Sequence, residues 1–444
     1  MHTIAVNEFP SRSLPVKIST ISSTFFGIGL AILLFESIFF QSAADLAYAG
    51  LGTSALIGFH LFFSEIWFIF VGNFLAITLL VRNKLILPRA VLVSAVPPVL
   101  ILSVYSIAFV HGIFLGNVAA PEEFREMVFS ALGLPGILYL AQAVNLRRVL
   151  EIFIQSGIWV VLVASVLGAH ASVLMLSSFF VGYYSLRFLH EKPFALAKLF
   201  VALLPYVIVF SKPMLALVAF SLLVSFVLAG HFHTRSRNWL LSRFKLSMLM
   251  KLFAVLALFL LVVFSVNWFF GGIIEEAIRY YFLKERVSNT SGAIRYGDWS
   301  GGRIGIWTAA VASWMQRPLL GYGLGAPLEA YASGWVVKTQ FHNYILQTLH
   351  NCGAIGFAVI FASSLYWLRG RFHAIHSIYA MREKMLAVSM LVGVLGVLFY
   401  GLYGHSLSFP PAAQFFWFCV GYLSLLKPPY PNIHGIRYGP SNSN

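Results

Sequence analysis

Long apolar runs separated by short polar segments repeat along nearly the whole chain. Each run is close to the ~20 residues that a helix needs to cross a ~30 Å hydrocarbon layer. About twelve runs are present, at residues 20–41, 61–81, 90–111, 126–144, 149–168, 172–189, 194–210, 213–230, 252–270, 343–368, 385–404 and 410–426. Because a helix satisfies its own backbone hydrogen bonds in lipid, the pattern predicts an all-α, polytopic integral membrane protein with about twelve transmembrane helices.

The polar segments divide the chain into four parts. Residues 1–270 are expected to hold the first nine spans with short loops, and residues 271–342 to form one large loop. The last three spans follow in residues 343–426, and residues 427–444 form a tail. The first apolar run is too long for a cleaved signal peptide, so it is expected to remain as an anchor. The glycine-containing stretch 42–60 is compatible with a re-entrant segment or a plain loop.

Composition and charge agree with a membrane protein and indicate its orientation. Hydrophobic residues make up 59% of the chain, charged residues only 10%, and the mean hydropathy is +0.83, which excludes a soluble globular protein. With both termini in the cytoplasm, roughly two-thirds of the 30 Lys and Arg residues fall on the cytoplasmic side, as the positive-inside rule requires. The net charge of +15 then reflects topology and contact with anionic membrane lipids rather than nucleic acid.

Several kinds of chemistry find no support in the sequence. The chain has no GxxxxGK[ST] loop, no GxGxxG motif after a strand and no HExxH motif. Its two cysteines, Cys352 and Cys419, have no spacing typical of a metal site. We therefore expect no cofactor and no metal, and the energy for any reaction must come with the substrate.

Two basic residues near the predicted outer face are candidates for function. Arg125 lies at the start of the fourth span, and Lys212 lies in the tight turn between the seventh and eighth spans. A cation close to the membrane interior is costly enough to suggest a function. The alternative for Lys212 is a side chain that snorkels to the interface, and the alternative for Arg125 is an ion pair with Glu122 or Glu126.

The large loop and the start of the tenth span combine further cations with a histidine. The loop contains Arg303 and Arg317, and His342 with its neighbour Asn343 lies where the tenth span begins. A neutral imidazole, with an ordinary pKa near 6.5, can take a proton from a hydroxyl. His350, further into the span, is better explained as a helix histidine with satisfied hydrogen bonds. Arg303, Arg317, His342 and Asn343 together predict a site for an anionic, lipid-linked substrate.

The order of these residues resembles the bacterial O-antigen ligase and polymerase superfamily. The resemblance covers about 55 residues of the chain. It is carried by Gly302, Arg303, Trp307, Arg317, Pro318, Leu319, Gly321, Gly323, Gly325, His342, Asn343, Leu346, Gly353 and Gly356. Members of this superfamily are glycosyltransferases of the inner membrane that use undecaprenyl-diphosphate-linked glycans as donors. The layout of about twelve spans with one large, late periplasmic loop is also similar.

The resemblance implies a role for each candidate residue. His342 would be the catalytic base, and Arg303, Lys212 and Arg125, with Asn343 and Arg317 beside them, would bind the diphosphate and glycan. The family often has a Ser-Arg pair in the turn before the eighth span, whereas this chain has Ser211-Lys212-Pro213. Lysine keeps the charge but cannot form the bidentate hydrogen bonds of arginine.

The sequence favours a ligase, and two alternative functions remain open. A ligase would transfer the glycan to lipid A-core at the periplasmic face, with inversion at the anomeric carbon and without a metal. A polymerase would join the glycan to a second lipid-linked repeat unit with the same residues. A transporter is the second alternative, because polar residues at the ends of spans can line a permeation path, although the sequence shows no internal hydropathy repeat.

Overall fold

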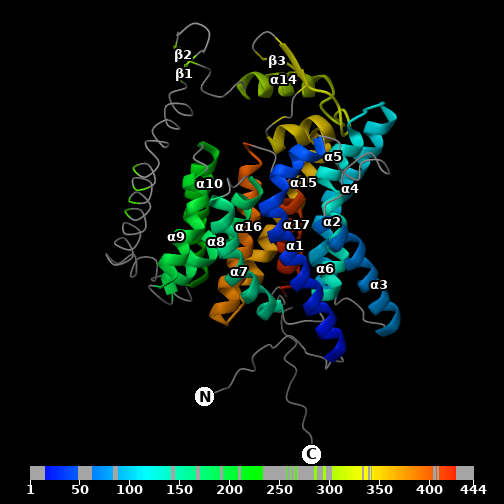
Figure 1. Ribbon diagram of the computed structural model, residues 1–444. Coiled ribbons are helices and arrows are strands. Elements are labelled where there is room, and N and C mark those ends of the chain that lie inside the picture. The colour runs from blue at the N-terminus through cyan, green and yellow to red at the C-terminus, as the bar shows by residue number, and fades with distance from the viewer. Residues whose placement is uncertain are drawn as a thin grey trace, which may run out of the picture.

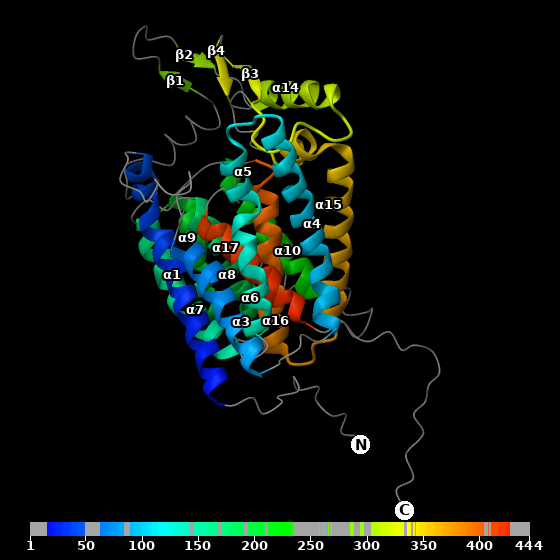
Figure 2. The ribbon, with the colours of Figure 1, turned by 90° about the vertical axis from the view of Figure 1, so that its right-hand side faces the viewer.

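Helices run up and down through the computed structural model, and a smaller set of short elements covers one end of them (Figures 1 and 2). The structure describes residues 16–48, 63–83, 89–141, 146–166, 171–190, 194–208, 212–233, 257, 261, 265, 268, 285–287, 294–296, 303–332, 335–338, 341, 343–403, 407 and 410–426. The described helices are α1 (Val16–Tyr48), α2 (Phe63–Glu65), the π-helix η1 (Ile66–Val71), α3 (Gly72–Asn83), α4 (Arg89–Phe114), α5 (Ala120–Met127), the 3-10 helix η2 (Phe129–Gly133), α6 (Leu134–Ala141), α7 (Leu146–Val166), α8 (Ala171–His190), α9 (Phe194–Ile208), α10 (Lys212–His233), α14 (Arg303–Gln316), α15 (Tyr344–His376), α16 (Met381–Tyr400) and α17 (Pro410–Leu425). Two antiparallel hairpins join β1 (Glu285–Val287) to β2 (Ile294–Tyr296) and β3 (Glu329–Ala332) to β4 (Trp335–Lys338).

The helices confirm the prediction of a polytopic membrane protein. Among the described residues, five helical segments are long and apolar enough to cross a membrane: Ser19–Glu36, Phe63–Arg82, Val91–Phe114, Tyr344–His376 and Met381–Tyr400. Shorter apolar helices cover Phe129–Ala141, Ala195–Tyr206, Leu215–Ala229 and Ala412–Leu425. The total of twelve spans stays a prediction, because the apolar run 252–270 and most of the stretch 42–60 lie outside the described residues. The short strands, which the sequence did not predict, are confined to the region expected as the large loop.

Phenylalanine rings fill the centre of the bundle. Phe153 of α7 stacks on Phe180 of α8 with ring centroids 5.7 Å apart, and Phe179 meets Phe415 of α17 edge to face at 5.6 Å. All four side chains are buried. Lipid is as apolar as these side chains, so close packing, rather than exclusion of water, holds such helices together.

The two ends of the bundle differ in their elements. At one end α15 begins and α16 finishes, since the Tyr344 amide donates to the Gly401 carbonyl at 2.9 Å. The start of α10 lies at this end too, because Phe220 stacks on Phe399 at 4.2 Å. We call it the cap end, because α5, α14 and both hairpins also lie there (Figures 1 and 2).

The opposite end collects basic residues, and we call it the basic end. Here α3, α8 and α15 finish. Arg82 and Arg187 lie in the last turns of α3 and α8, and Arg369 lies about two turns before the end of α15. By the positive-inside rule this end is predicted to face the cytoplasm.

One arginine that the sequence placed in a cytoplasmic loop is buried instead. The tenth predicted span ends at residue 368, but α15 continues to His376, and Arg371 is only 3% exposed. Its guanidinium donates to the carbonyls of Leu423 at 2.7 Å and Leu426 at 2.9 Å, and to the Ser94 hydroxyl at 2.8 Å. A cation at the carboxyl end of α17 interacts favourably with the partial negative charge of the last carbonyls of this helix. Some charge of the basic end therefore stabilises the bundle itself.

Candidate functional site

A glycine-rich turn follows α14 and passes close to three helices at the cap end. Gly321, Gly323 and Gly325 have φ angles of 71°, 75° and 72°, which other residues rarely adopt. A Cβ on Gly323 would lie 2.4 Å from the Gly112 amide nitrogen, and one on Gly325 would lie 2.0 Å from that of Ala120. Both the backbone angles and the space therefore require glycine.

The same turn provides hydrogen-bond partners for the backbone at a break in α15. Gly353 interrupts this helix with φ 66° and ψ −177°. The turn bonds to the backbone groups on both sides of the break, through Tyr322 N to His350 O (2.9 Å), Gly323 N to Asn351 O (2.9 Å), Ala354 N to Pro318 O (2.8 Å) and Ile355 N to Leu319 O (3.3 Å). Non-helical backbone at membrane depth is tolerated only where protein or water satisfies it. The turn and the first part of α15 thus form one structural unit.

Glu123 of α5 holds this unit from the other side. One carboxylate oxygen accepts hydrogen bonds from the Gly325 amide at 2.6 Å and the Asn351 side chain at 2.8 Å. The other accepts from the Gln347 side chain at 3.3 Å. Glu123 therefore connects α5, the turn and α15.

His350 is a satisfied helix histidine, as the sequence indicated. It is 1% exposed, its Nδ1 lies 3.1 Å from Asn351 Oδ1, and its Nε2 lies 3.1 Å from the Ser313 hydroxyl of α14. The ring also stacks on Tyr322 with centroids 4.9 Å apart. With both nitrogens engaged, this imidazole joins α14 to α15.

The predicted base His342 lies outside the described residues, but the residue before it is firmly held. Phe341 is 2% exposed and packs with Ile306 and Ala310 of α14. Its carbonyl accepts a hydrogen bond from the Trp307 indole at 3.2 Å. Trp307, which belongs to the sequence signature, therefore fixes the chain immediately before the histidine.

The residue after His342 is held as well. Asn343 is the N-cap of α15, and its side-chain oxygen accepts from the amides of Ile345 at 2.9 Å and Leu346 at 3.1 Å. Such a cap satisfies amides that the first helical turn leaves without partners. If Asn343 binds substrate as predicted, it does so through its side-chain nitrogen, Nδ2, because its side-chain oxygen caps the helix.

Arg303 and Lys212 both begin helices at the cap end. Arg303 is the first residue of α14 and Lys212 the first of α10. Their side chains lie outside the described parts of the structure. The helix α14 packs on α15 and β3, whereas α10 packs on α8 and α16. The backbone thus places both residues at the cap end, on helices with different neighbours.

Arg317 is exposed at the cap end and oriented by an aromatic ring. Its guanidinium carbon lies 4.9 Å from the centroid of the Tyr322 ring, the ring that stacks on His350. A cation–π contact of this kind limits where the charge can point. Arg317 is therefore a positioned cation beside the glycine-rich turn.

Arg125 pairs with a carboxylate that its sequence neighbourhood does not reveal. Its Nη1 lies 4.0 Å from Glu65 Oε1, and the two side chains are 12% and 0% exposed. The Ser130 hydroxyl donates to the same oxygen at 3.2 Å. Sequence spacing had suggested Glu122 or Glu126 as partners, whose side chains lie outside the described residues, and no local spacing could have suggested Glu65.

The sequence analysis missed the connecting residues of the site. Glu123, Gln347, Asn351 and Ser313 join its elements, and none was singled out. Two of them carried a usable signal, because Gln347 and Asn351 are polar residues four apart in an apolar span and so share one helix face. Among the described residues, no three His, Cys, Asp or Glu side chains are grouped so that they could hold a metal ion.

Residues 199–361 match the family model described as O-antigen ligase. The matched range begins in α9, includes α10, α14 and the glycine-rich turn, and ends in α15. This part of the chain is therefore similar to the O-antigen ligase family, and the resemblance found in the sequence is confirmed. The match supports a glycosyltransferase of the O-antigen ligase or polymerase type. No curated protein and no solved structure matches the chain significantly.

Proposed function

We propose that the protein is an O-antigen ligase, which moves a glycan from undecaprenyl diphosphate to a hydroxyl of lipid A-core at the periplasmic face of the inner membrane. The observation that carries the proposal is that the residues on both sides of His342 are held in place by hydrogen bonds. Trp307 binds the carbonyl of Phe341, and Asn343 caps α15. The histidine that the family uses therefore stands in the chain between two fixed residues, within the matched domain.

In the proposed reaction His342 is the general base. It takes the proton of the acceptor hydroxyl as that oxygen attacks the anomeric carbon of the glycan. The bond from this carbon to the diphosphate oxygen breaks, and its electron pair leaves with undecaprenyl diphosphate. Attack opposite the leaving group inverts the anomeric configuration. A histidine acts as a base in its neutral form, in which one ring nitrogen can accept the proton.

The basic residues of the cap end take up the charge of the leaving diphosphate. We assign this role to Arg303 and Lys212, the first residues of α14 and α10, and to Arg317, which Tyr322 holds beside the turn. Charge-assisted hydrogen bonds of this kind stabilise a transition state most where water is scarce. Arg125, oriented by Glu65, is the fourth cation of the proposed site.

A reconstituted transfer assay tests the proposal. Purified protein is given undecaprenyl-diphosphate-linked repeat units with or without lipid A-core, and the products are resolved on a gel. Glycan attached to lipid A-core is expected only when that acceptor is present. A ladder of longer undecaprenyl-linked chains without lipid A-core would instead identify a polymerase, and no product in either reaction would contradict both.

Within this assay, the change His342→Ala tests the proposed base. Loss of general-base catalysis lowers a rate by about 10²–10⁴-fold, and we expect a reduction of this size in glycan transfer. The matched control is His373→Ala, which removes an exposed histidine from the basic end of α15 and should leave the rate unchanged. Full activity of His342→Ala would exclude it as the base.

A further inference from the structure

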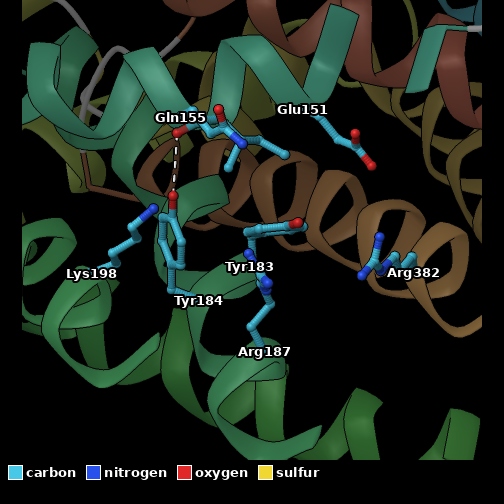
Figure 3. A pocket seen from close by; sticks show the side chains of 8 residues that line it. Glu151, Gln155, Tyr183, Tyr184, Arg187, Lys198 and Arg382 are labelled. Carbon is cyan, nitrogen blue, oxygen red and sulfur yellow. Dashed lines mark hydrogen bonds between the residues drawn. The ribbon is translucent and has the colours of Figure 1, made fainter. Parts of the chain in front are cut away.

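A polar cavity lies at the basic end, far from the cap. Its volume is about 140 Å³, and it opens between α7, α8, α9 and α16 (Figure 3). The side chains that define its chemistry are Arg187, Lys198, Arg382, Glu151, Tyr183 and Tyr184. None of them was singled out as a functional residue from the sequence.

Lys198 is the most unusual of these residues. It lies within the apolar helix segment Ala195–Tyr206, and its side chain is only partly exposed. A lysine in such a segment is costly and suggests a function. Its ammonium group is 5.8 Å from the centroid of the Tyr184 ring, whose hydroxyl donates to the Ile154 carbonyl at 3.3 Å. The ring is thus anchored, and it limits the positions of the cation.

Two arginines complete the basic lining. The Arg187 guanidinium lies 5.8 Å from the centroid of the Tyr183 ring, and Arg382 approaches from α16 on another side (Figure 3). The one carboxylate of the lining, Glu151, accepts a hydrogen bond from Arg147 at 3.0 Å. Three cations around one cavity repel one another, and this arrangement favours an anionic occupant.

We propose that this cavity binds the phosphate group of an anionic lipid. A guanidinium matches the oxygens of a phosphate with two parallel hydrogen bonds. The volume is roughly ten times the ~10–15 Å³ that one water needs, so a phosphate group has room. Basic pockets between transmembrane helices near the cytoplasmic surface bind lipid headgroups. Free phosphate has the same chemistry, and the experiment separates the two sources.

Thermal unfolding of the full-length protein in a neutral detergent provides the test. The probes are dihexanoyl-phosphatidylglycerol, dihexanoyl-phosphatidylcholine and inorganic phosphate, each titrated separately. A ligand that binds the native state raises the unfolding temperature with concentration. We expect phosphatidylglycerol to stabilise the wild type, and phosphatidylcholine and inorganic phosphate to have little effect at the same concentrations.

The variants Lys198→Gln and Arg82→Gln separate the cavity from the general charge of the basic end. Both remove one positive charge, but Arg82 is exposed on α3 and does not line the cavity. Loss of a charged hydrogen bond weakens binding by about tenfold or more. Lys198→Gln should therefore need at least about tenfold more phosphatidylglycerol than the wild type for the same rise in unfolding temperature. Arg82→Gln should respond like the wild type. If Lys198→Gln fails to fold, Arg382→Gln takes its place, with the same expected result.

Each other outcome decides against part or all of the proposal. Equal stabilisation by the two lipids would show an effect of lipid that does not depend on its net charge, and equal weakening in Lys198→Gln and Arg82→Gln would show general attraction to the basic surface. Either result would overturn the site. Stabilisation by inorganic phosphate that depends on Lys198 would keep the phosphate site and overturn the lipid as its source. The outcome does not depend on glycan transfer, because unfolding is measured without donor or acceptor.

Discussion

Single polar side chains join parts of the bundle that are distant in sequence. Glu123 connects α5 with Gln347 and Asn351 of α15, and Arg371 connects α15 with the end of α17. A buried polar group that loses its partner costs about 1–3 kcal/mol. These contacts therefore favour one arrangement of helices that apolar packing alone would specify weakly.

Asn343 has a structural role that can be separated from its proposed role in binding. Its side-chain oxygen caps α15, and loss of an N-cap costs about 1 kcal/mol. We expect Asn343→Ala to lower the unfolding temperature, and Asn343→Ser to retain most of the stability because serine also caps helices. Thermal unfolding and glycan transfer are measured on both variants.

The comparison of stability and activity decides between the two roles of Asn343. Transfer that follows stability, preserved in Asn343→Ser and reduced in Asn343→Ala, would indicate that the cap is what matters. A stable Asn343→Ser protein without activity would indicate that the amide nitrogen contacts the substrate. Equal stability of Asn343→Ala and the wild type would contradict the cap itself.

The sequence predicted some individual residues and missed others for a physical reason. His350 could be interpreted correctly because a histidine in an apolar helix needs nearby partners, and the structure supplies Asn351 and Ser313. Glu65 could not be predicted as the partner of Arg125, because their contact joins α5 to α2, two elements that lie far apart in the sequence. Local spacing contains no information about such packing.

At the scale of elements, the broken helix α15 explains why the signature is rich in glycine. The break at Gly353 exposes carbonyls and amides, and the turn with Gly321 and Gly323 bonds to them. The sequence identified these glycines only through their resemblance to a family. Their role is structural, since they allow two backbones to approach each other closely.

The change Gly353→Ala should therefore be strongly destabilising. A Cβ at this position would lie 2.2 Å from the Leu319 carbonyl oxygen, and the φ of 66° is already unfavourable for alanine. Strain of this kind costs about 1–3 kcal/mol before the steric clash is counted. We expect a clear fall in unfolding temperature and in the yield of folded protein.

Gly370 offers a matched control on the same helix. A Cβ there would have no heavy atom within 4 Å, and Gly370 lies within helical backbone near the end of α15. Alanine is the better helix former by roughly 0.5–1 kcal/mol, so Gly370→Ala should leave stability unchanged or slightly higher. Equal effects of Gly353→Ala and Gly370→Ala would show that the break does not require glycine.

On the scale of the whole molecule, hydropathy predicted the helices well because lipid permits few alternatives. Most predicted spans coincide with described helices, from α1 to α17. Prediction from hydropathy failed outside the apolar spans, where lipid does not restrict the backbone to helices, as in the strands β3 and β4 of the cap. It also failed at Arg371, because a cation interrupts an apolar run even when the helix continues and the charge is satisfied inside the protein.

The two ends differ in a way that makes the orientation testable. Arg317 at the cap end and Arg82 at the basic end are both exposed, and the native Cys352 and Cys419 are both buried. Single changes to cysteine at either position thus introduce one accessible thiol. The positive-inside rule predicts that the basic end faces the cytoplasm.

In intact cells, a thiol reagent that cannot cross the inner membrane should label Arg317→Cys and not Arg82→Cys. After the membrane is permeabilised, both variants should be labelled, and the unchanged protein should remain unlabelled because its cysteines are buried. The reverse pattern would place the cap in the cytoplasm. The proposed transfer requires the donor and acceptor glycans to reach the cap from the periplasm, so that pattern would contradict the proposed reaction as well as the orientation.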